Sequence, residues 1–301
     1  MRQRGCMMNT LLKTLDIVDK LPDGLVELYQ IVDEHTTALG IPYLVVGATA
    51  RDIVLVHGYN ANIERGTRDV DFGIQVQKWE QFDQLKTRLL ESGFVQHKDK
   101  IHQLNMIDSN NMPWEIDIVP FGEIAQSTLD NTNHIEIAWP PEQDFVMNVM
   151  GFSEAFENAL TVKIAETPEL KIKVASPAGM LILKLISWLE RGSEIRKKDA
   201  TDIYYLVKQY AKIPEVLNAL YNQGFMETQN YEELAASAMK IAQDAKRIAS
   251  PDTVAFINER LFAGERSADN LVLDISRSQQ ITYEEAEKVL NIIKREFEIS
   301  D

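Results

Sequence analysis

One short stretch, Arg68 to Ile74, constrains the fold of this chain most, because apolar residues alternate strictly there with acidic or small ones. This alternation predicts a β-strand, since successive side chains of a strand point to opposite faces. Two residues along a strand span about 6.6 Å, so two carboxylates on one face stand side by side. One face would be apolar and the other acidic or small: Val70, Phe72 and Ile74 against Asp69, Asp71 and Gly73.

A second strand with the same pattern is predicted over Trp114 to Val119. Its apolar face would carry Ile116 and Ile118, and its other face Glu115 and Asp117. If the apolar faces of both strands meet a common layer of helices, the acidic faces converge on the opposite side. Three converging carboxylates suit Mg²⁺, a hard cation that prefers oxygen ligands and leaves room for substrate phosphates. Alternation alone leaves both Glu115 and Asp117 as candidates for the third ligand.

The composition shows that an acidic pair alone is weak evidence for a metal site. The chain has 46 acidic residues and a formal net charge of -15, so an isolated Asp-x-Asp would carry little weight. The second acidic strand and a glycine turn at the right distance make the joint pattern far more specific. The negative charge argues against a broad nucleic-acid-binding surface, which needs Lys and Arg to neutralise phosphates. It does not exclude the end of a nucleic acid that meets one local basic patch.

The glycine turn follows a predicted short strand, Tyr43 to Val46, and leads into a helix predicted from about Thr49 to His57. Backbone N–H groups at a helix N-terminus, with the helix dipole behind them, form a site for a triphosphate. The small residues Gly47 and Ala48 would allow a phosphate to approach the backbone closely. Arg51 and Arg68 would either offset phosphate charge or pair with a nearby acid, and the sequence leaves both readings open.

The remaining pattern divides the chain into an α/β part over residues 1–175 and a helical part over residues 176–301. In the first part, Gly40 ends a helix over 25–39 and Gly93 closes one over 79–91. Strands are expected over 94–107 and as a pair over 162–174. In the second, Ser176–Pro177 is typical of a helix start, and helices are predicted over 178–191, 198–211, 231–248, 252–263 and 282–297. The predicted fold class is α/β (α+β): a mixed sheet with flanking helices, followed by a helical domain.

These residues resemble the nucleotidyltransferase superfamily that includes polymerase beta. Within it, the R-x-T-x-D-x-D form is similar to the AbiEii/AbiGii-type toxins of bacterial toxin–antitoxin and abortive-infection systems. The resemblance covers roughly residues 40–210. It is carried by Gly47 after an apolar strand, by the run Arg65-Gly66-Thr67-Arg68-Asp69-Val70-Asp71, and by Glu115-Ile116-Asp117-Ile118.

The resemblance implies a role for each matching residue. Gly47, with Ala48 and Thr49, would belong to the phosphate-facing turn, while Asp69 and Asp71 would form the metal pair. Asp117 would be the third carboxylate, which in the superfamily activates the attacking hydroxyl. One position departs from the pattern: Ala48 stands where the superfamily usually has serine or a second glycine, so a hydroxyl contact to phosphate is missing there.

A second block, Leu183 to Trp188 followed by Arg196 to Tyr204, also resembles that toxin family. It implies that Lys184 and Asp202 lie near the nucleotide as catalytic residues. On a helix, Lys184 and Trp188 would share one stripe. The alternative is that Lys184 neutralises Asp202 in an interhelical salt bridge. The five histidines show no metal-ligand spacing and are expected to be structural or surface residues.

The resemblance therefore implies a nucleotidyltransferase that uses an NTP with Mg²⁺ or Mn²⁺. The expected acceptor is an RNA 3′ end and the expected partner an antitoxin protein. A small molecule or a protein side chain is the alternative acceptor, and a non-catalytic nucleotide- or partner-binding module is the alternative of another class. The single cysteine, Cys6, cannot form an internal disulfide, and no signal-peptide or membrane-spanning stretch is evident. A cytoplasmic location is expected.

Overall fold

The structure is a computed structural model that describes residues 14–298, apart from 65, 67, 128–134, 142–144 and 264–266. The predictions that involve Cys6, Arg65 and Thr67 therefore lie outside the described residues.

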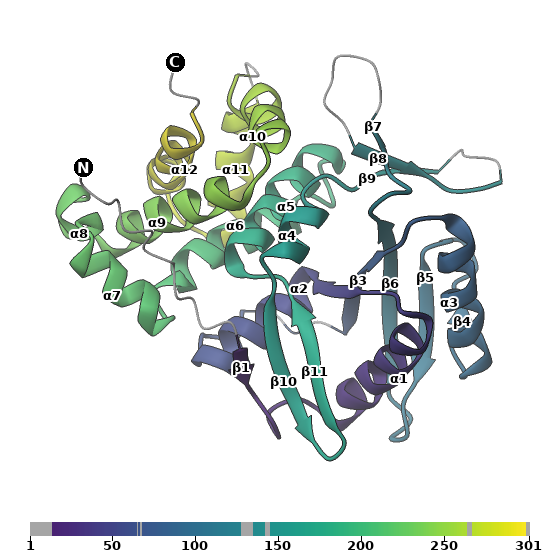
Figure 1. The fold of residues 1–301 in the computed structure, drawn as a ribbon. Coiled ribbons are helices and arrows are strands. Elements are labelled where there is room, and N and C mark those ends of the chain that lie inside the picture. Colours follow the sequence, from purple (N-terminus) through teal and green to yellow (C-terminus); the bar gives the residue numbers. More distant parts are fainter. Residues whose placement is uncertain are drawn as a thin grey trace, which may run out of the picture.

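In the described part of the chain, eight strands form one mixed sheet (Figure 1). Their order is β1-β10-β11-β2-β3-β6-β5-β4, so β3 and β6, the two predicted acidic strands, lie side by side. They run parallel to each other, whereas β2 and β5 flank them antiparallel. The strands are β1 (Thr14–Asp16), β2 (Tyr43–Val46), β3 (Asp69–Gln75), β4 (Val95–Gln96), β5 (Gln103–Ile107), β6 (Pro113–Phe121), β10 (Leu160–Glu166) and β11 (Glu169–Val174). A smaller antiparallel sheet contains β7 (Gln126–Ser127), β8 (Ile135–Ala138) and β9 (Val146–Asn148).

Two helices, α1 (Asp23–Leu39) and α3 (Trp79–Glu91), pack against each other and against the apolar face of this sheet. The ring of Tyr29 in α1 meets the ring of Phe72 in β3 edge-on, with 5.8 Å between centroids. Because Phe72 points toward α1, its neighbour Asp71 points to the opposite face, as the alternation predicts. Gly40 ends α1 in the left-handed conformation (φ 64°) that glycine adopts without strain.

After β2 the chain enters α2 (Gly47–Arg51), which continues directly into a π-helical segment, η1 (Asp52–Gly58). The helix therefore starts at the glycine itself, two residues earlier than predicted. A six-residue helix, α4 (Phe152–Glu157), precedes the strand pair β10–β11.

From residue 177 onward, the described residues that form regular structure are helical, and these helices gather to one side of the sheet (Figure 1). Ser176 caps the first of them by accepting a hydrogen bond from the Gly179 N–H, with Pro177 in the first turn. The helices are α5 (Pro177–Glu190), α6 (Lys197–Tyr210), α7 (Pro214–Asn222), α8 (Phe225–Thr228), α9 (Glu233–Ile248), α10 (Pro251–Ile257), η2 (Asn258–Phe262), α11 (Ser267–Gln279) and α12 (Tyr283–Phe297).

The predicted fold class is confirmed: a large mixed sheet with flanking helices precedes a helical half. The prediction of one strand over residues 94–107 was wrong. These residues form the hairpin β4–β5, with the polar turn around Lys98 between the two strands. The division into domains at residue 175 stays a prediction. None of the described helices has the length and apolar character needed to cross a membrane.

Candidate active site

Two of the predicted acidic residues, Asp71 and Asp117, belong to a row of paired residues that runs across four neighbouring strands. Val46 of β2 pairs with Asp71 of β3, which pairs with Asp117 of β6, which pairs in turn with Gln103 of β5. Paired residues on adjacent strands are about 5 Å apart and share a face, so Asp71 and Asp117 are immediate neighbours. Two residues earlier, Asp69 pairs with Glu115. The register therefore puts Asp117 beside the inner member of the predicted metal pair.

Asp71 lies at the centre of this row, and its surroundings disfavour its charge. Burial, and after it the negative charge of Asp117, raise the pKa of the Asp71 carboxyl from 3.8 to about 6. Lys184 and Arg191 act in the opposite direction. The carboxylates of the sheet and the cations of α5 and its C-terminal end thus face one another closely enough to interact.

Gly47 is in contact with the Asp71 carboxylate. Its φ of 71° lies in the left-handed region, and a Cβ atom built on it would lie 1.8 Å from Asp71 Oδ2. Both facts require glycine here. The hydroxyl of Thr49, two residues after Gly47, donates to the backbone carbonyl of Asp69 at 2.6 Å. This bond holds the start of α2 against the start of β3, which brings the predicted phosphate turn beside the predicted metal pair.

Asp117 is held by a residue that the sequence did not single out. Gln103 Nε2 donates to Asp117 Oδ1 at 2.9 Å, and Lys100 Nζ donates to Gln103 Oε1 at 3.2 Å. Among the described residues, the other oxygen of Asp117 accepts no hydrogen bond. The only signal for Gln103 was its position in a strand expected next to the acidic one.

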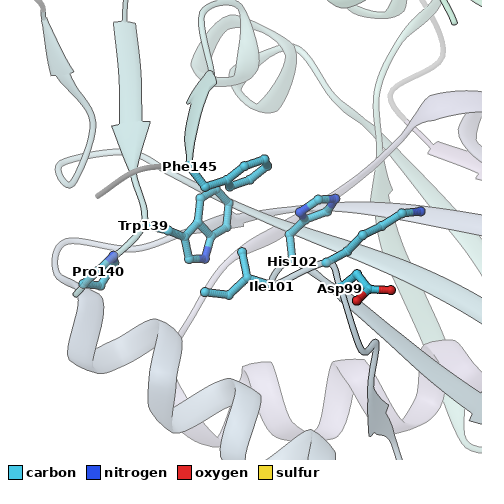
Figure 2. Close-up of a pocket in the computed structure, with 7 residues that line it drawn as sticks. Asp99, Ile101, His102, Trp139, Pro140 and Phe145 are labelled. Atoms are coloured by element: carbon cyan, nitrogen blue, oxygen red, sulfur yellow. The ribbon is translucent and has the colours of Figure 1, made fainter. Parts of the chain in front are cut away.

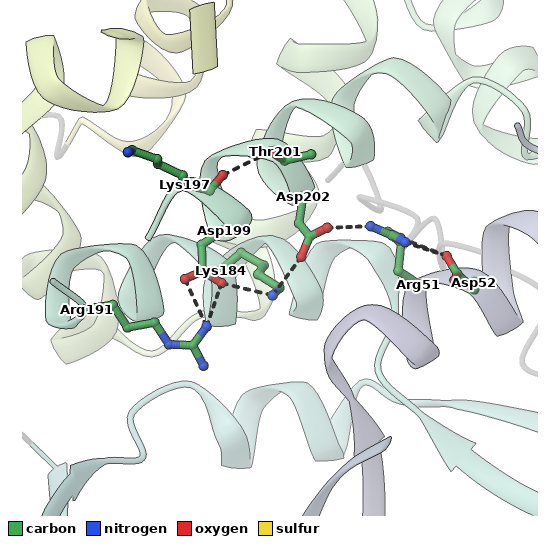
Figure 3. Close-up of polar contacts among 8 residues, drawn as sticks. All are labelled: Arg51, Asp52, Lys184, Arg191, Lys197, Asp199, Thr201 and Asp202. Carbon is green, nitrogen blue, oxygen red and sulfur yellow. Dashed lines mark hydrogen bonds and ion pairs between the residues drawn. The ribbon is translucent and has the colours of Figure 1, made fainter. Parts of the chain in front are cut away.

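Lys184, Asp199 and Asp202 of the second block belong to an interhelical ion network of six alternating charges (Figure 3). Lys184 Nζ lies 3.0 Å from Asp199 Oδ1 and 2.8 Å from Asp202 Oδ2. Asp202 also pairs with Arg51, and Arg191 Nη1 lies 3.0 Å from Asp199 Oδ2. Burial opposes the charge of Lys184, but its two carboxylate partners outweigh burial and hold its pKa above the usual value. Followed from one contact to the next, the network consists of Asp52, Arg51, Asp202, Lys184, Asp199 and Arg191.

The structure therefore contains the salt bridge that was the alternative reading of Lys184 and Asp202. It also gives Arg51 acidic partners: the guanidinium is 2% exposed and bonds Asp202 and Asp52, with its carbon 4.7 Å from the centre of the Tyr205 ring. Arg68 is exposed beside the acidic strand. The network joins α2 and η1 of the first half to α5 and α6 of the second.

The three predicted ligands offer the chemistry of a divalent-cation site, but not its complete geometry. Among the described residues, no group of three or more His, Cys, Asp or Glu side chains is arranged to hold a metal ion, so the three predicted ligands do not form a complete site as they stand. Their chemistry nonetheless fits Mg²⁺, since Asp69, Asp71 and Asp117 all offer carboxylate oxygens. Burial first, and the charge of Asp117 second, raise the pKa of Asp71, so a cation bound there would favour its ionised form. Glycine at residue 47 leaves the space of the Asp71 carboxylate free.

Comparison with known proteins decides the family. The profile of the family described as "Nucleotidyl transferase AbiEii toxin, Type IV TA system" matches residues 35–272, most of the chain. The chain belongs to this family. It is a nucleotidyltransferase, and the match contains Gly47, the acidic strands and the second block. A comparison with curated proteins found no match.

Three solved structures show weaker likeness to this AbiEii-family chain. A lincosamide antibiotic adenylyltransferase, LnuA, bound to lincomycin, is 16% identical over 60% of this chain and 94% of its own, with a TM-score of 0.35. The Thermotoga maritima CCA-adding enzyme complexed with tRNA is 10% identical over 93% and 82%, with a TM-score of 0.26. A CCA-adding enzyme with CTP is 11% identical over 91% and 78%, with a TM-score of 0.25.

Proposed function

We propose that this AbiEii-family protein transfers a nucleoside monophosphate from an NTP to an acceptor hydroxyl and releases pyrophosphate. The observation that carries the proposal is the row Asp71–Asp117 beside the Gly47 turn. A carboxylate pair next to a glycine at a helix start brings an anion-binding backbone and metal-binding oxygens to one place. Catalysis of this kind is mostly positioning and charge neutralisation.

The triphosphate would lie against the turn formed by Gly47, Ala48 and Thr49. The acceptor oxygen would attack the α-phosphorus and form a new P–O bond. The bond from the α-phosphorus to the bridging oxygen of the β-phosphate would break, and pyrophosphate would leave. The hydroxyl proton would pass to Asp117, whose orientation Gln103 fixes through Oδ1.

Asp69, Asp71 and Asp117 are the residues that would hold Mg²⁺ or Mn²⁺. Bound there, the ion supplies positive charge against the phosphate oxygens and the attacking oxygen. The protein contributes the geometry: the strand pairing fixes the spacing of Asp71 and Asp117, and Gly47 leaves their space open.

We assign Lys184, Asp202 and Arg51 to the nucleotide side of the same site. Lys184 lies near enough to Asp71 to lower its pKa, so its charge would also act on phosphates bound beside that carboxylate. Asp202 holds Lys184 and Arg51 together, and this supports a positioning role for Asp202 and Arg51. Arg68, exposed immediately before β3, would reach a phosphate from solvent.

The proposed acceptor is the 3′ end of an RNA, and the proposed biological role is that of a toxin restrained by an antitoxin protein inside the bacterial cell. The family description supports this role. A small molecule or a protein side chain is the rival acceptor.

The test is incubation of the protein with each labelled NTP, Mg²⁺, and total bacterial RNA and protein. Label in RNA, with release of pyrophosphate, is the expected result. Asp71→Asn should abolish it. Asp19→Asn is the matched control, because Asp19 is exposed and its φ of 63° suits asparagine. Label only in protein or in small molecules would overturn the RNA acceptor. NTP binding without pyrophosphate release from any mixture would overturn the transfer reaction and leave a binding module.

A further inference from the structure

A pocket opens beside the active site, on the side of the sheet occupied by β5. It has a volume of about 310 Å³, at the small end of the range of about 300–1,000 Å³ for ligand pockets. The turn before β5 and the ends of β8 and β9 line it: Asp99, Lys100, Ile101, His102, Trp139, Pro140 and Phe145. A pocket of this volume suits a single nucleotide better than it suits the surface of a folded macromolecule.

Three aromatic rings gather in the pocket (Figure 2). The His102 and Phe145 rings are nearly parallel, at an interplanar angle of 6° with centroids 5.3 Å apart, and Trp139 lies 5.3 Å from Phe145. Phe145 remains 40% exposed, so one ring presents surface to a ligand. Base stacking on such rings tolerates any base, because every base has a π-face.

Two polar atoms of these rings lack partners among the described residues. They are Nδ1 of His102 and the indole N–H of Trp139, a residue that is 4% exposed. A buried polar atom without a hydrogen bond is costly, and a bound ligand or water that reaches it would remove that cost. Both atoms belong to side chains that line the pocket.

Three lysines, Lys86, Lys98 and Lys100, lie at or next to this pocket although the chain as a whole is acidic. Lys100 lines the pocket, and Lys86 Nζ donates to the backbone carbonyl of Ile101, another lining residue, at 3.1 Å. Lys98 is exposed in the same turn, while Asp99 is the acid that lines the pocket. This is the kind of local basic patch that an acidic protein needs to accept a phosphodiester.

The pocket lies opposite the phosphate turn. In the strand order β2-β3-β6-β5, the Gly47 turn follows β2, whereas His102 directly precedes β5. Attacking and leaving oxygens are roughly in line on opposite sides of the phosphorus. In the proposed reaction pyrophosphate would leave on the β2 side, so an in-line acceptor would come from the β5 side. There, Lys100 connects to Asp117 through Gln103.

We infer that this aromatic pocket holds the unpaired terminal base of a single-stranded RNA acceptor, stacked on Phe145 and His102, with its 3′-hydroxyl directed toward Asp117. The inference rests on the proposed function, since it specifies where that reaction's acceptor binds. It assigns acceptor recognition to the turn 97–102 and to the segments that carry Trp139 and Phe145.

The probe is a short single-stranded RNA that carries 2-aminopurine as its 3′-terminal base, titrated without NTP so that binding is read apart from transfer. Stacking quenches 2-aminopurine, so the wild-type protein should quench it. Phe145→Ala should weaken binding at least about 5-fold, the lower bound for one stacked base. Phe145→Tyr, which keeps the ring, should restore it. Tyr231→Ala, at an exposed aromatic of the helical half, is the matched control and should bind as the wild type does.

Transfer kinetics supply the second readout. Phe145→Ala should raise KM for the RNA and leave KM for the NTP and the melting temperature unchanged. Absence of quenching by the wild-type protein, or unaltered RNA binding by Phe145→Ala, would overturn the pocket assignment even if RNA becomes labelled. Quenching that depends on Phe145, without any label in RNA, would instead support the pocket and reject the proposed reaction.

Discussion

At the scale of single residues, the contact between Gly47 and Asp71 links the phosphate turn to the carboxylate row. A side chain at residue 47 would occupy the space of Asp71 Oδ2, so the two predicted halves of the site are mutually dependent. A substitution at residue 47 would add both backbone strain and a clash with Asp71. Gly40 has a similar φ of 64°, but no atom lies within 4 Å of the position that a Cβ atom would take there. A substitution at residue 40 therefore measures the backbone strain alone.

We therefore expect Gly47→Ala to abolish transfer, since the added methyl group displaces the Asp71 carboxylate. Gly40→Ala should leave activity unchanged and cost only the strain of a left-handed alanine, about 1 kcal/mol. The measurements are the transfer rate and the melting temperature of both variants. Equal activity of the two would show that the turn does not position Asp71.

Asp71→Asn should have opposite effects on activity and stability. The pKa of Asp71 is about 6 in the folded protein against 3.8 for the ordinary group. The folded state therefore binds the proton more tightly, and stability is lost as the pH rises from about 4 to 6. Above that range the ionised group destabilises the metal-free protein by up to about 3 kcal/mol, which asparagine avoids.

In metal-free buffer, Asp71→Asn should thus melt several degrees above the wild type at pH 7.5, and the difference should vanish near pH 4. Thermal melts at both pH values check this. A variant that melts lower than the wild type at pH 7.5 would mean that the Asp71 charge is compensated by the cations of α5.

Asp117 and Glu115 share a strand face but differ in their neighbours, since Asp117 pairs with Asp71 and Glu115 with Asp69. Glu115 is also exposed. Asp117→Asn should therefore cost far more transfer activity than Glu115→Gln, measured as kcat/KM for the NTP. The reverse ranking would make Glu115 the third carboxylate.

At the scale of secondary-structure elements, the sequence predicted those whose limits are set locally. β2 and α3 have the predicted limits, because an apolar run or an amphipathic period ends at a glycine or turn residue. The short helices α7 and α8 and the small strands β7–β9 were not predicted, since segments this short lack a distinct period. The π-helical η1 depends on packing that no local pattern encodes.

For the site, alternation predicted which face Asp71 and Asp117 occupy, but it could not predict the register that makes them neighbours. Register follows from pairing between strands that are distant in sequence. The same reason explains why Gln103 was missed. Lys184 and Asp202 were predicted as a possible pair, but the second partners, Asp199 and Arg51, come from the packing of α2, α5 and α6.

The interhelical ion network makes a prediction about these three helices. Its charges alternate and cancel, so removing Lys184 leaves an excess negative charge on buried Asp199 and Asp202. Breaking a buried pair typically costs about 3–5 kcal/mol, and the remaining partners Arg51 and Arg191 should keep the loss below that. Lys184→Met should therefore lower the melting temperature, and Lys184→Met with Asp202→Asn should recover part of the loss.

Activity separates structure from function in this cycle. If Lys184 also acts on the nucleotide phosphates, the double variant regains stability while its transfer rate stays low. Recovery of both stability and activity would leave Lys184 a structural residue.

At the scale of the whole molecule, a chain of net charge -15 would have to receive the proposed polyanionic acceptor through a small region. The patch formed by Lys86, Lys98 and Lys100 meets that requirement. Each phosphate contact to a single strand contributes about -0.7 to the slope of log K against log salt. Three contacts should therefore weaken RNA binding roughly 20-fold between about 50 and 200 mM salt, far less than for a protein that coats nucleic acid.

The double variant Lys98→Ala, Lys100→Ala should raise KM for the RNA at low salt and flatten its salt dependence to about one remaining contact, because two of the three cations are gone. Lys212→Ala, at an exposed lysine of the helical half, should change neither.

The sign of the change in KM distinguishes the rival acceptors. A cationic small molecule is repelled by these lysines, so the same double variant would lower its KM. A neutral acceptor would show no salt dependence in any variant, and either result would remove RNA as the acceptor.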